Sequence, residues 1–163
     1  MRSRVALLFT GAAGVLLASY HWQRLPQRVA GHFNGSGLPD GWMGRDANFF
    51  LSAGLIVGMT AGFYLLGVMM RRIPPRWINL PNKDYWFAPD REEQTRNHLT
   101  GWAWTFGTLL NIFLLFVFHM VYLANRSDPV AIDSTAMIVG LIVYLAVSLG
   151  GVIVLLFRFG KAR

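Results

Sequence analysis

Four long stretches of this chain contain no aspartate, glutamate, lysine or arginine: residues 5–23, 47–70, 97–125 and 134–157. An α-helix needs about 20 consecutive, mostly apolar residues to cross the hydrocarbon core of a bilayer. The last three stretches exceed that length, and the first approaches it. Because hydrocarbon offers no partner to free backbone groups, each stretch is expected to form a helix that bonds its own backbone. We therefore predict an all-α integral membrane protein with four transmembrane helices in a compact bundle.

The expected spans cover approximately residues 5–23, 47–70, 99–124 and 134–157 of a single domain, residues 1–163. Composition supports this interpretation, because 14% of the residues are charged, against about 25% in soluble domains. The first stretch also resembles a signal peptide, since Arg2 and Arg4 precede an apolar run. Its end, Ala18-Ser19-Tyr20, fits the small-residue cleavage pattern poorly, so we interpret it as an uncleaved anchor.

Lysine and arginine are unevenly distributed among the connections between the spans. Eleven lie before the first span, between the second and third, or after the fourth, whereas four lie in the other two connections. Cytoplasmic connections carry the excess of positive charge, so this pattern places both termini and the loop 71–98 in the cytoplasm, and the loop 24–46 outside. Topology and attraction to anionic lipid explain the net charge of +7, so no nucleic-acid partner is expected.

The outward loop is rich in turn-forming residues. Asn34-Gly35-Ser36-Gly37 and Pro39-Asp40-Gly41 each form a turn signal, because Asn and Gly adopt positive φ at low cost and Pro fixes φ. Apolar side chains between and after these turns predict a small cap folded over the bundle; they are Val29, Phe33, Leu38 and Trp42. We expect His32 and Asp40 to hydrogen-bond to backbone groups of the turns and hold the loop in shape.

Glycine spacing predicts how the spans pack. Gly54, Gly58 and Gly62 recur at four-residue intervals in the second span, and small residues at this spacing let helix backbones approach closely in membranes. The first span offers Gly14 and Ala18 at the same interval. We predict that spans one and two pack tightly, with a second subunit as the alternative partner of the second span.

Two polar residues stand out in the third span. Asn111 lies near the middle of the membrane and His119 near its outer boundary. Polar side chains at depth normally face the interior of a helix bundle. Asn111 is therefore expected to hydrogen-bond to a neighbouring helix, with a proton or solute path as the less favoured alternative.

The cytoplasmic loop combines prolines, aromatic residues and cations. Prolines at positions 74, 75, 81 and 89 prevent a long helix. Asp90 and Glu93 form a capping-box pattern, which predicts a helix that runs into the third span. Between Pro75 and Asp90 lie the candidate residues for contact with lipid or a partner: Trp77, Lys83, Asp84, Tyr85, Trp86 and Phe87. This composition suits a segment anchored at the inner headgroups or a docking surface for a partner, and both interpretations stay open.

The chain offers little for catalysis or metal binding. It has no cysteine, which excludes thiolate chemistry and disulfides. Around His32 and Asp40, only His21 could add a third ligand, and catalytic zinc usually takes three from the protein. Ser36 lacks a base or oxyanion site nearby. We expect no metal, no cofactor, no catalytic residue and no enzymatic activity.

Residues 25–42, LPQRVAGHFNGSGLPDGW, resemble the signature of the uncharacterised membrane domain at the N-terminus of Sdp-type immunity proteins. The run NLPNKDYW at residues 79–86 resembles a subset of the same proteins. That bacterial family protects producing cells against a secreted toxic peptide, and its signature loop likewise follows the first span. The resemblance implies a multi-pass protein of the bacterial plasma membrane.

Together these features predict a non-enzymatic immunity- or sensor-like protein that binds a peptide or protein outside the cell. The expected ligand-binding residues are Arg28, His32, Phe33, Asn34, Pro39, Asp40 and Trp42. The alternative is an accessory subunit, held in a larger membrane complex by its glycine face and aromatic cytoplasmic loop. A small-solute or proton transporter is the third possibility.

Overall fold

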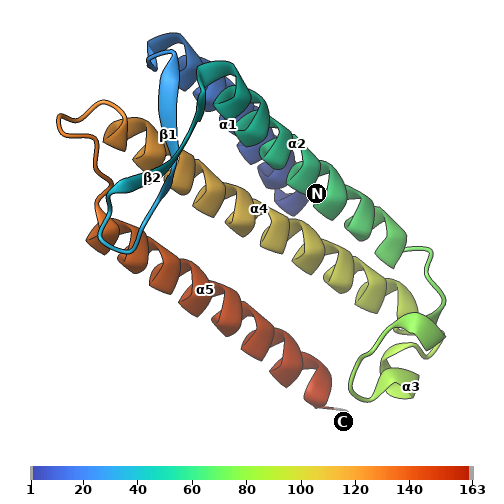
Figure 1. Cartoon of the computed structure of the whole chain (residues 1–163). Coiled ribbons are helices and arrows are strands. Elements are labelled where there is room, and N and C mark those ends of the chain that lie inside the picture. Colours follow the sequence, from blue (N-terminus) through green and yellow to red (C-terminus); the bar gives the residue numbers. More distant parts are fainter. Residues whose placement is uncertain (1, 162–163) are drawn as a thin grey trace.

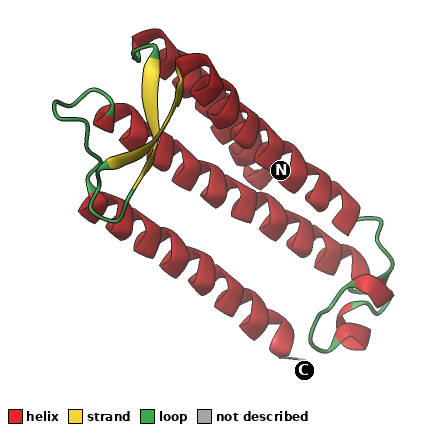
Figure 2. Cartoon of the chain, in the orientation of Figure 1, coloured by secondary structure: helices red, strands yellow, loops and turns green. Residues whose placement is uncertain are grey.

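The computed structural model describes residues 2–161. Four long helices make up most of it: α1 (Arg2–Arg24), α2 (Arg45–Met70), α4 (Glu92–Ala124) and α5 (Ser134–Gly160). All four are long and apolar enough to cross a membrane, which confirms the prediction of a helical four-span fold. Strands β1 (Arg28–Phe33) and β2 (Pro39–Gly44) form a hairpin between α1 and α2, as Figure 2 shows. Two short helices, η1 (Pro75–Trp77) and α3 (Lys83–Trp86), lie between α2 and α4.

The long helices run side by side, and successive helices point in opposite directions (Figure 1). Helices α1, α2 and α4 pack against one another, and α5 packs against α4. The hairpin and the α4–α5 connection lie at one end of the bundle, whereas α3 and the C-terminal end of α5 lie at the other. This alternation is the one that four consecutive spans require.

Helices α1 and α2 meet through the glycines of α1. A Cβ built on Gly11 would lie 2.6 Å from Thr60 Oγ1, and one on Gly14 would lie 2.8 Å from Ile56 Cγ2. These glycines therefore let α2 approach at a distance that any side chain would prevent.

The glycines of α2 do not make this contact, contrary to prediction. A Cβ built on Gly54, Gly58 or Gly62 meets no atom within 4 Å in the part of the chain that the structure describes. The reason is rotation about the helix axis. Gly54 and Gly58 are each two residues from Ile56, about 200° around the helix, so they face away when Ile56 faces α1. A second subunit on this face stays a prediction.

The loop between α2 and α4 folds back onto the end of α5. Asn82 Nδ2 donates to the carbonyl oxygens of Phe159 and Gly160, at 3.1 and 3.0 Å. Trp86 Nε1 donates to the same Phe159 oxygen at 2.8 Å. The Trp86 and Phe159 rings pack edge-on, with their centres 5.2 Å apart. The last carbonyls of a helix have no partner within it, so this loop caps α5.

Helix α4 starts without the predicted capping box. Its N-cap residue is Arg91, which makes no side-chain capping hydrogen bond. The carboxylate of Asp90 pairs with the Arg91 guanidinium at 3.0 Å instead. The helix does continue without interruption from Glu92 through the third span, as the sequence predicts.

Candidate ligand-binding hairpin

The loop between α1 and α2 forms a two-stranded antiparallel hairpin, where the sequence predicted turns alone. Its tip is the turn formed by Asn34 to Gly37, in which Asn34 Oδ1 accepts from the amides of Ser36 and Leu38 at 2.9 and 3.1 Å. Gly37 adopts a φ of +79°, which glycine does at little cost. An Asn- and Gly-rich turn between apolar residues is a hairpin signal, so this feature was within reach of the sequence.

The base of the hairpin is buried against the helices, as expected of a cap. Val29 and Ala30 are fully buried, and Val29 packs with Leu25 and Tyr122 in a small core. The side-chain amide of Asn125 binds both backbone groups of Ala30. It accepts from Ala30 N at 2.7 Å and donates to Ala30 O at 2.9 Å. Asn125 thus acts as a third strand would, and satisfies a buried strand edge.

The tip of the hairpin is fixed to the connection between α4 and α5. The amide of Ile132 donates to the carbonyl oxygen of Gly37 at 2.9 Å. Gly37 is buried at this contact, and a Cβ there would approach the Ile132 carbonyl oxygen and the Ser134 hydroxyl. The hairpin is therefore held at both ends, by α1 and α4 at its base and by the α4–α5 connection at its tip (Figure 1).

The strands of the hairpin carry four exposed side chains: Arg28, His32, Asp40 and Trp42. We call these four residues the hairpin face. The Arg28 guanidinium carbon lies 5.1 Å from the centre of the Trp42 ring. His32 Nδ1 and Asp40 Oδ1 are hydrogen-bonded, so these residues bind each other and not the turn backbone, contrary to prediction. The side chains of His32 and Asp40 are 75% and 44% exposed, which leaves both accessible to a ligand.

The other predicted loop residues have structural positions. Phe33 and Pro39 are opposite each other where the strands meet the tip, and both are half-buried. Asn34 forms the turn. The seven predicted ligand-binding residues therefore divide into four on the hairpin face and three that shape it.

Residues 8–57 match the family model of DUF1648, a domain of unknown function. The chain carries a DUF1648 domain. The matched DUF1648 segment begins within α1, includes the whole hairpin and ends within α2. It therefore contains the entire hairpin face, and the four long apolar helices make the chain a multi-pass membrane protein. No curated protein and no solved structure matches the chain.

A histidine pair links the DUF1648 segment to α4 beneath the hairpin. His21 Nε2 and His119 Nδ1 are 3.2 Å apart, and one ring nitrogen donates to the other. His21 also stacks on Tyr122 with ring centres 4.2 Å apart. His21 is thus buried in a packed aromatic cluster, whereas His32 is exposed on the hairpin. Among residues 2–161, no group of three or more His, Asp or Glu is placed to hold a metal ion.

Asn111 makes the interhelical hydrogen bonds that its position predicts. Its side-chain amide donates to Thr60 Oγ1 of α2 at 2.9 Å and to Thr10 Oγ1 of α1 at 3.3 Å. Asn111 is fully buried at the point where α1, α2 and α4 meet. These contacts give Asn111 a role in helix packing. A transport path stays the less favoured alternative.

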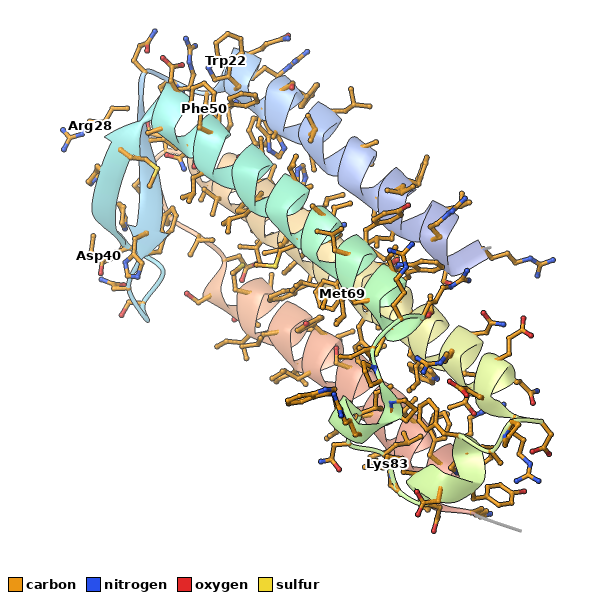
Figure 3. All side chains as sticks on the ribbon, turned by 90° about the vertical axis from the view of Figure 1, so that its right-hand side faces the viewer. Trp22, Arg28, Asp40, Phe50, Met69 and Lys83 are labelled. Atoms are coloured by element: carbon orange, nitrogen blue, oxygen red, sulfur yellow. The ribbon has the colours of Figure 1, made fainter. Side chains whose placement is uncertain are left out.

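The aromatic residues of the loop between α2 and α4 separate into two groups. Trp86 is used inside the protein to cap α5, and the Tyr85 ring lies 4.0 Å from the Arg91 guanidinium carbon. Trp77 is 70% exposed, and Asp84 is exposed in α3, which begins at Lys83. Figure 3 shows Lys83 at the opposite end of the bundle from Arg28 and Asp40. Trp77 thus retains both interpretations, interface anchoring and docking, whereas Trp86 has a partner within the chain.

Proposed function

We propose that this protein is a non-enzymatic, immunity- or sensor-like protein of the bacterial plasma membrane that recognises a peptide or protein through the hairpin face. In this proposal both termini are cytoplasmic and the hairpin is extracytoplasmic, as the distribution of lysine and arginine suggests. One observation carries the proposal. The backbone of the hairpin is bonded at Ala30 to Asn125, at the end of α4, while the side chains of Arg28, His32, Asp40 and Trp42 are left accessible.

The chemistry of the hairpin face suits protein recognition. Tryptophan and arginine are enriched among the residues that contribute most to protein binding, and here Arg28 lies over the Trp42 ring. His32 and Asp40 add a donor and an acceptor at the other end of the face. Because the hairpin is fixed at its base and tip, little conformational entropy remains to be lost when a ligand binds.

A peptide is the favoured ligand because of the resemblance of residues 25–42 to the signature of Sdp-type immunity proteins. The match to the DUF1648 family covers the same loop and says nothing about immunity, so the ligand class rests on that resemblance.

The test uses bacteria that produce the protein from a plasmid and are exposed to the peptide fraction secreted by its native host. Wild-type protein should protect these cells and should form a photo-crosslink to a secreted peptide from a reactive residue at position 42. Trp42→Ala and Arg28→Ala should each lower protection while membrane insertion is unchanged. Trp77→Ala, at the other end of the bundle, is the control and should protect fully. Full protection by a variant that lacks all four side chains of the hairpin face would refute the proposal.

An accessory-subunit function is the second candidate, because two apolar surfaces have no partner in the described chain. The apolar centre of α5 is exposed along its length, and Gly54, Gly58 and Gly62 border open space. Extraction in a mild detergent should then recover a stoichiometric complex, and Gly58→Leu should release the partner. A monomer on size-exclusion chromatography would count against this function.

A further inference from the structure

A groove follows the seam between α1 and α2 on the membrane-facing surface of the bundle. Its longer part encloses about 660 Å³, and its walls are almost entirely apolar; they include Leu8, Ala12, Val15, Val57, Ala61 and Leu65. Leu8, Val57 and Leu65 are each about half exposed. This part of the groove therefore opens towards the hydrocarbon chains of the bilayer.

A second part of the groove, of about 490 Å³, lies at the hairpin end of the same seam. It is lined by Ser19, Trp22, Gln23, Asp46, Phe49 and Phe50, and Figure 3 shows Trp22 and Phe50 at this end of α1 and α2. Unlike the longer part, it is bordered by a carboxylate, an amide and a hydroxyl as well as aromatic rings.

The two parts follow each other along one face of α1. On α1 the lining residues Leu8, Ala12, Val15, Ser19 and Trp22 recur every three or four positions, which places them on one helix face. Leu8 and Trp22 are about 21 Å apart along the helix axis at 1.5 Å per residue. Half of the hydrocarbon core is about 15 Å thick. The groove thus begins at the membrane boundary and extends slightly past the middle of the bilayer.

The boundary end of the groove carries a carboxylate beside an aromatic ring, and the guanidinium of Arg45 lies next to them outside the lining. Trp22 Nε1 donates to Asp46 Oδ1 at 2.7 Å, which fixes the carboxylate next to the indole, and the Asp46 side chain is 67% exposed. The Arg45 guanidinium carbon lies 5.2 Å from the Trp22 ring, and Arg45 Nε lies 3.9 Å from Asp46 Oδ1. An aromatic ring with a carboxylate attracts ammonium groups, and a guanidinium attracts phosphate.

We propose that the α1–α2 groove binds a zwitterionic phospholipid with an ammonium-bearing headgroup, such as phosphatidylethanolamine, from the leaflet at the hairpin end. The ammonium group lies at Asp46 and Trp22, the phosphate lies at Arg45, and one acyl chain follows the apolar walls towards Leu8 and Leu65. This assignment rests on how charged and apolar residues are distributed along the groove. The charged residues lie at the membrane boundary, where lipid headgroups lie, and the rest of the groove is apolar. An anionic headgroup without an ammonium would be repelled by Asp46.

The test compares binding of two synthetic lipids with identical acyl chains, phosphatidylethanolamine and phosphatidylglycerol, to the delipidated full chain by native mass spectrometry. Wild-type protein should bind phosphatidylethanolamine more tightly. Asp46→Asn should weaken that binding about two- to five-fold, the range expected for an exposed ammonium beside a carboxylate and an aromatic ring, and should leave phosphatidylglycerol binding unchanged or stronger. Asp128→Asn is the matched control, because it removes an exposed carboxylate from the α4–α5 connection, outside the groove, and it should retain wild-type binding.

A second pair of variants tests the apolar part. Ala61→Trp fills the groove and should lower binding of both lipids, whereas Ala146→Trp, on the exposed surface of α5, should have no effect. Equal binding of the two lipids by wild-type protein, or unchanged binding by Asp46→Asn, would overturn the proposal. So would a dimer that is lost in Ala61→Trp and kept in Ala146→Trp, because the groove would then be occupied by a second copy of the chain.

Discussion

Single polar side chains connect elements that are far apart in the sequence. Asn111 joins α4 to both α1 and α2, and Asn125 joins α4 to β1. The histidine pair joins α1 to α4 near the hairpin. In hydrocarbon the hydrophobic effect does not bring helices together, so hydrogen bonds and close packing decide their arrangement.

Replacement of Asn111 by alanine should lower the free energy of unfolding by about 0.6 to 2 kcal/mol, the range for interhelical hydrogen bonds in membranes. We expect the lower half of that range, because Asn111 Oδ1 is buried without a partner among residues 2–161 and its removal relieves an unfavourable term. Steric-trap unfolding in bicelles measures the difference. Thr105→Val is the control, since Thr105 bonds only to the backbone of its own helix; an equal loss in both variants would contradict the argument.

Asn125→Ala should expose the Ala30 amide to solvent exchange. Loss of the side-chain amide leaves a buried N–H and a buried carbonyl unpaired, at about 1 to 3 kcal/mol for each group, and opens the base of the hairpin. Hydrogen exchange of Ala30 should then accelerate by tenfold or more, because each 1.4 kcal/mol is a factor of ten. Asn125→Asp keeps the acceptor for Ala30 N and loses the donor, so its Ala30 protection should be intermediate. Wild-type protection in Asn125→Ala would show that the hairpin does not depend on this residue.

Among the elements, the helices differ in how they are held. Helices α1, α2 and α4 share a packed interior, whereas α5 packs against α4 and is held at its C-terminal end by Asn82 and Trp86. The hairpin lies outside both the three-helix interior and the α4–α5 contact. Hydrogen bonds to its backbone at Ala30 and Gly37 hold it in place. Each element therefore has a separate point at which it can be loosened.

Leucine at two glycines on neighbouring helices should have opposite effects on stability. Gly14→Leu forces a side chain against Ile56 and Leu115, and overpacking of this kind costs about 1 to 3 kcal/mol. Gly58→Leu meets no atom of the described chain, and helix propensity favours leucine over glycine, so the monomer should be unchanged or slightly more stable. Thermal unfolding of the purified monomer in detergent measures both. Destabilisation of the monomer by Gly58→Leu alone would reverse the assignment of the helix faces.

Loss of the α5 cap should loosen the end of that helix and leave the rest intact. Trp86→Phe keeps an aromatic ring for contact with Phe159 and removes the hydrogen bond from Nε1 to its carbonyl oxygen. Asn82→Ala removes two such bonds. With about 0.5 to 1.5 kcal/mol for each hydrogen bond, Asn82→Ala should increase amide exchange in the last turns of α5 more than Trp86→Phe does. Equal exchange in wild-type and both variants would contradict the capping role.

At the scale of the whole molecule, the two ends of the bundle differ in chemistry. One end presents the hairpin face and the α4–α5 connection, and the other presents the basic loop with η1 and α3. The distribution of lysine and arginine predicts that the first end is extracytoplasmic.

Single cysteines test this topology directly, because the chain has none of its own. Ser36→Cys lies at the exposed hairpin tip and should react with a membrane-impermeant maleimide on intact cells. Lys83→Cys lies at the other end of the bundle and should react only after the membrane is opened. Labelling in the opposite order would invert the topology and rule out recognition of an extracytoplasmic ligand by the hairpin.

Much of the fold was predictable because it depends on local composition. The hairpin strands were missed because β1 contains Gly31 and β2 contains Gly41 and Gly44, which weaken the alternation that marks a strand. All four residues of the hairpin face were among the candidates named from the sequence. The contact between His32 and Asp40, however, depends on the register of the two strands. Asn125 gave no signal, since its partner Ala30 is 95 residues away in the chain.

The sequence by itself determined the number of long apolar helices, their alternating direction and the position of the turn-rich segment between the first two. Lipid selects long uncharged stretches whatever surrounds them, so these features can be read from residues in order. Only the tertiary structure decided which glycines join α1 to α2, which loop caps α5, and which residues of the hairpin are buried. Those outcomes depend on the rotation of each helix about its axis and on hydrogen bonds between distant residues, neither of which is encoded in any one segment.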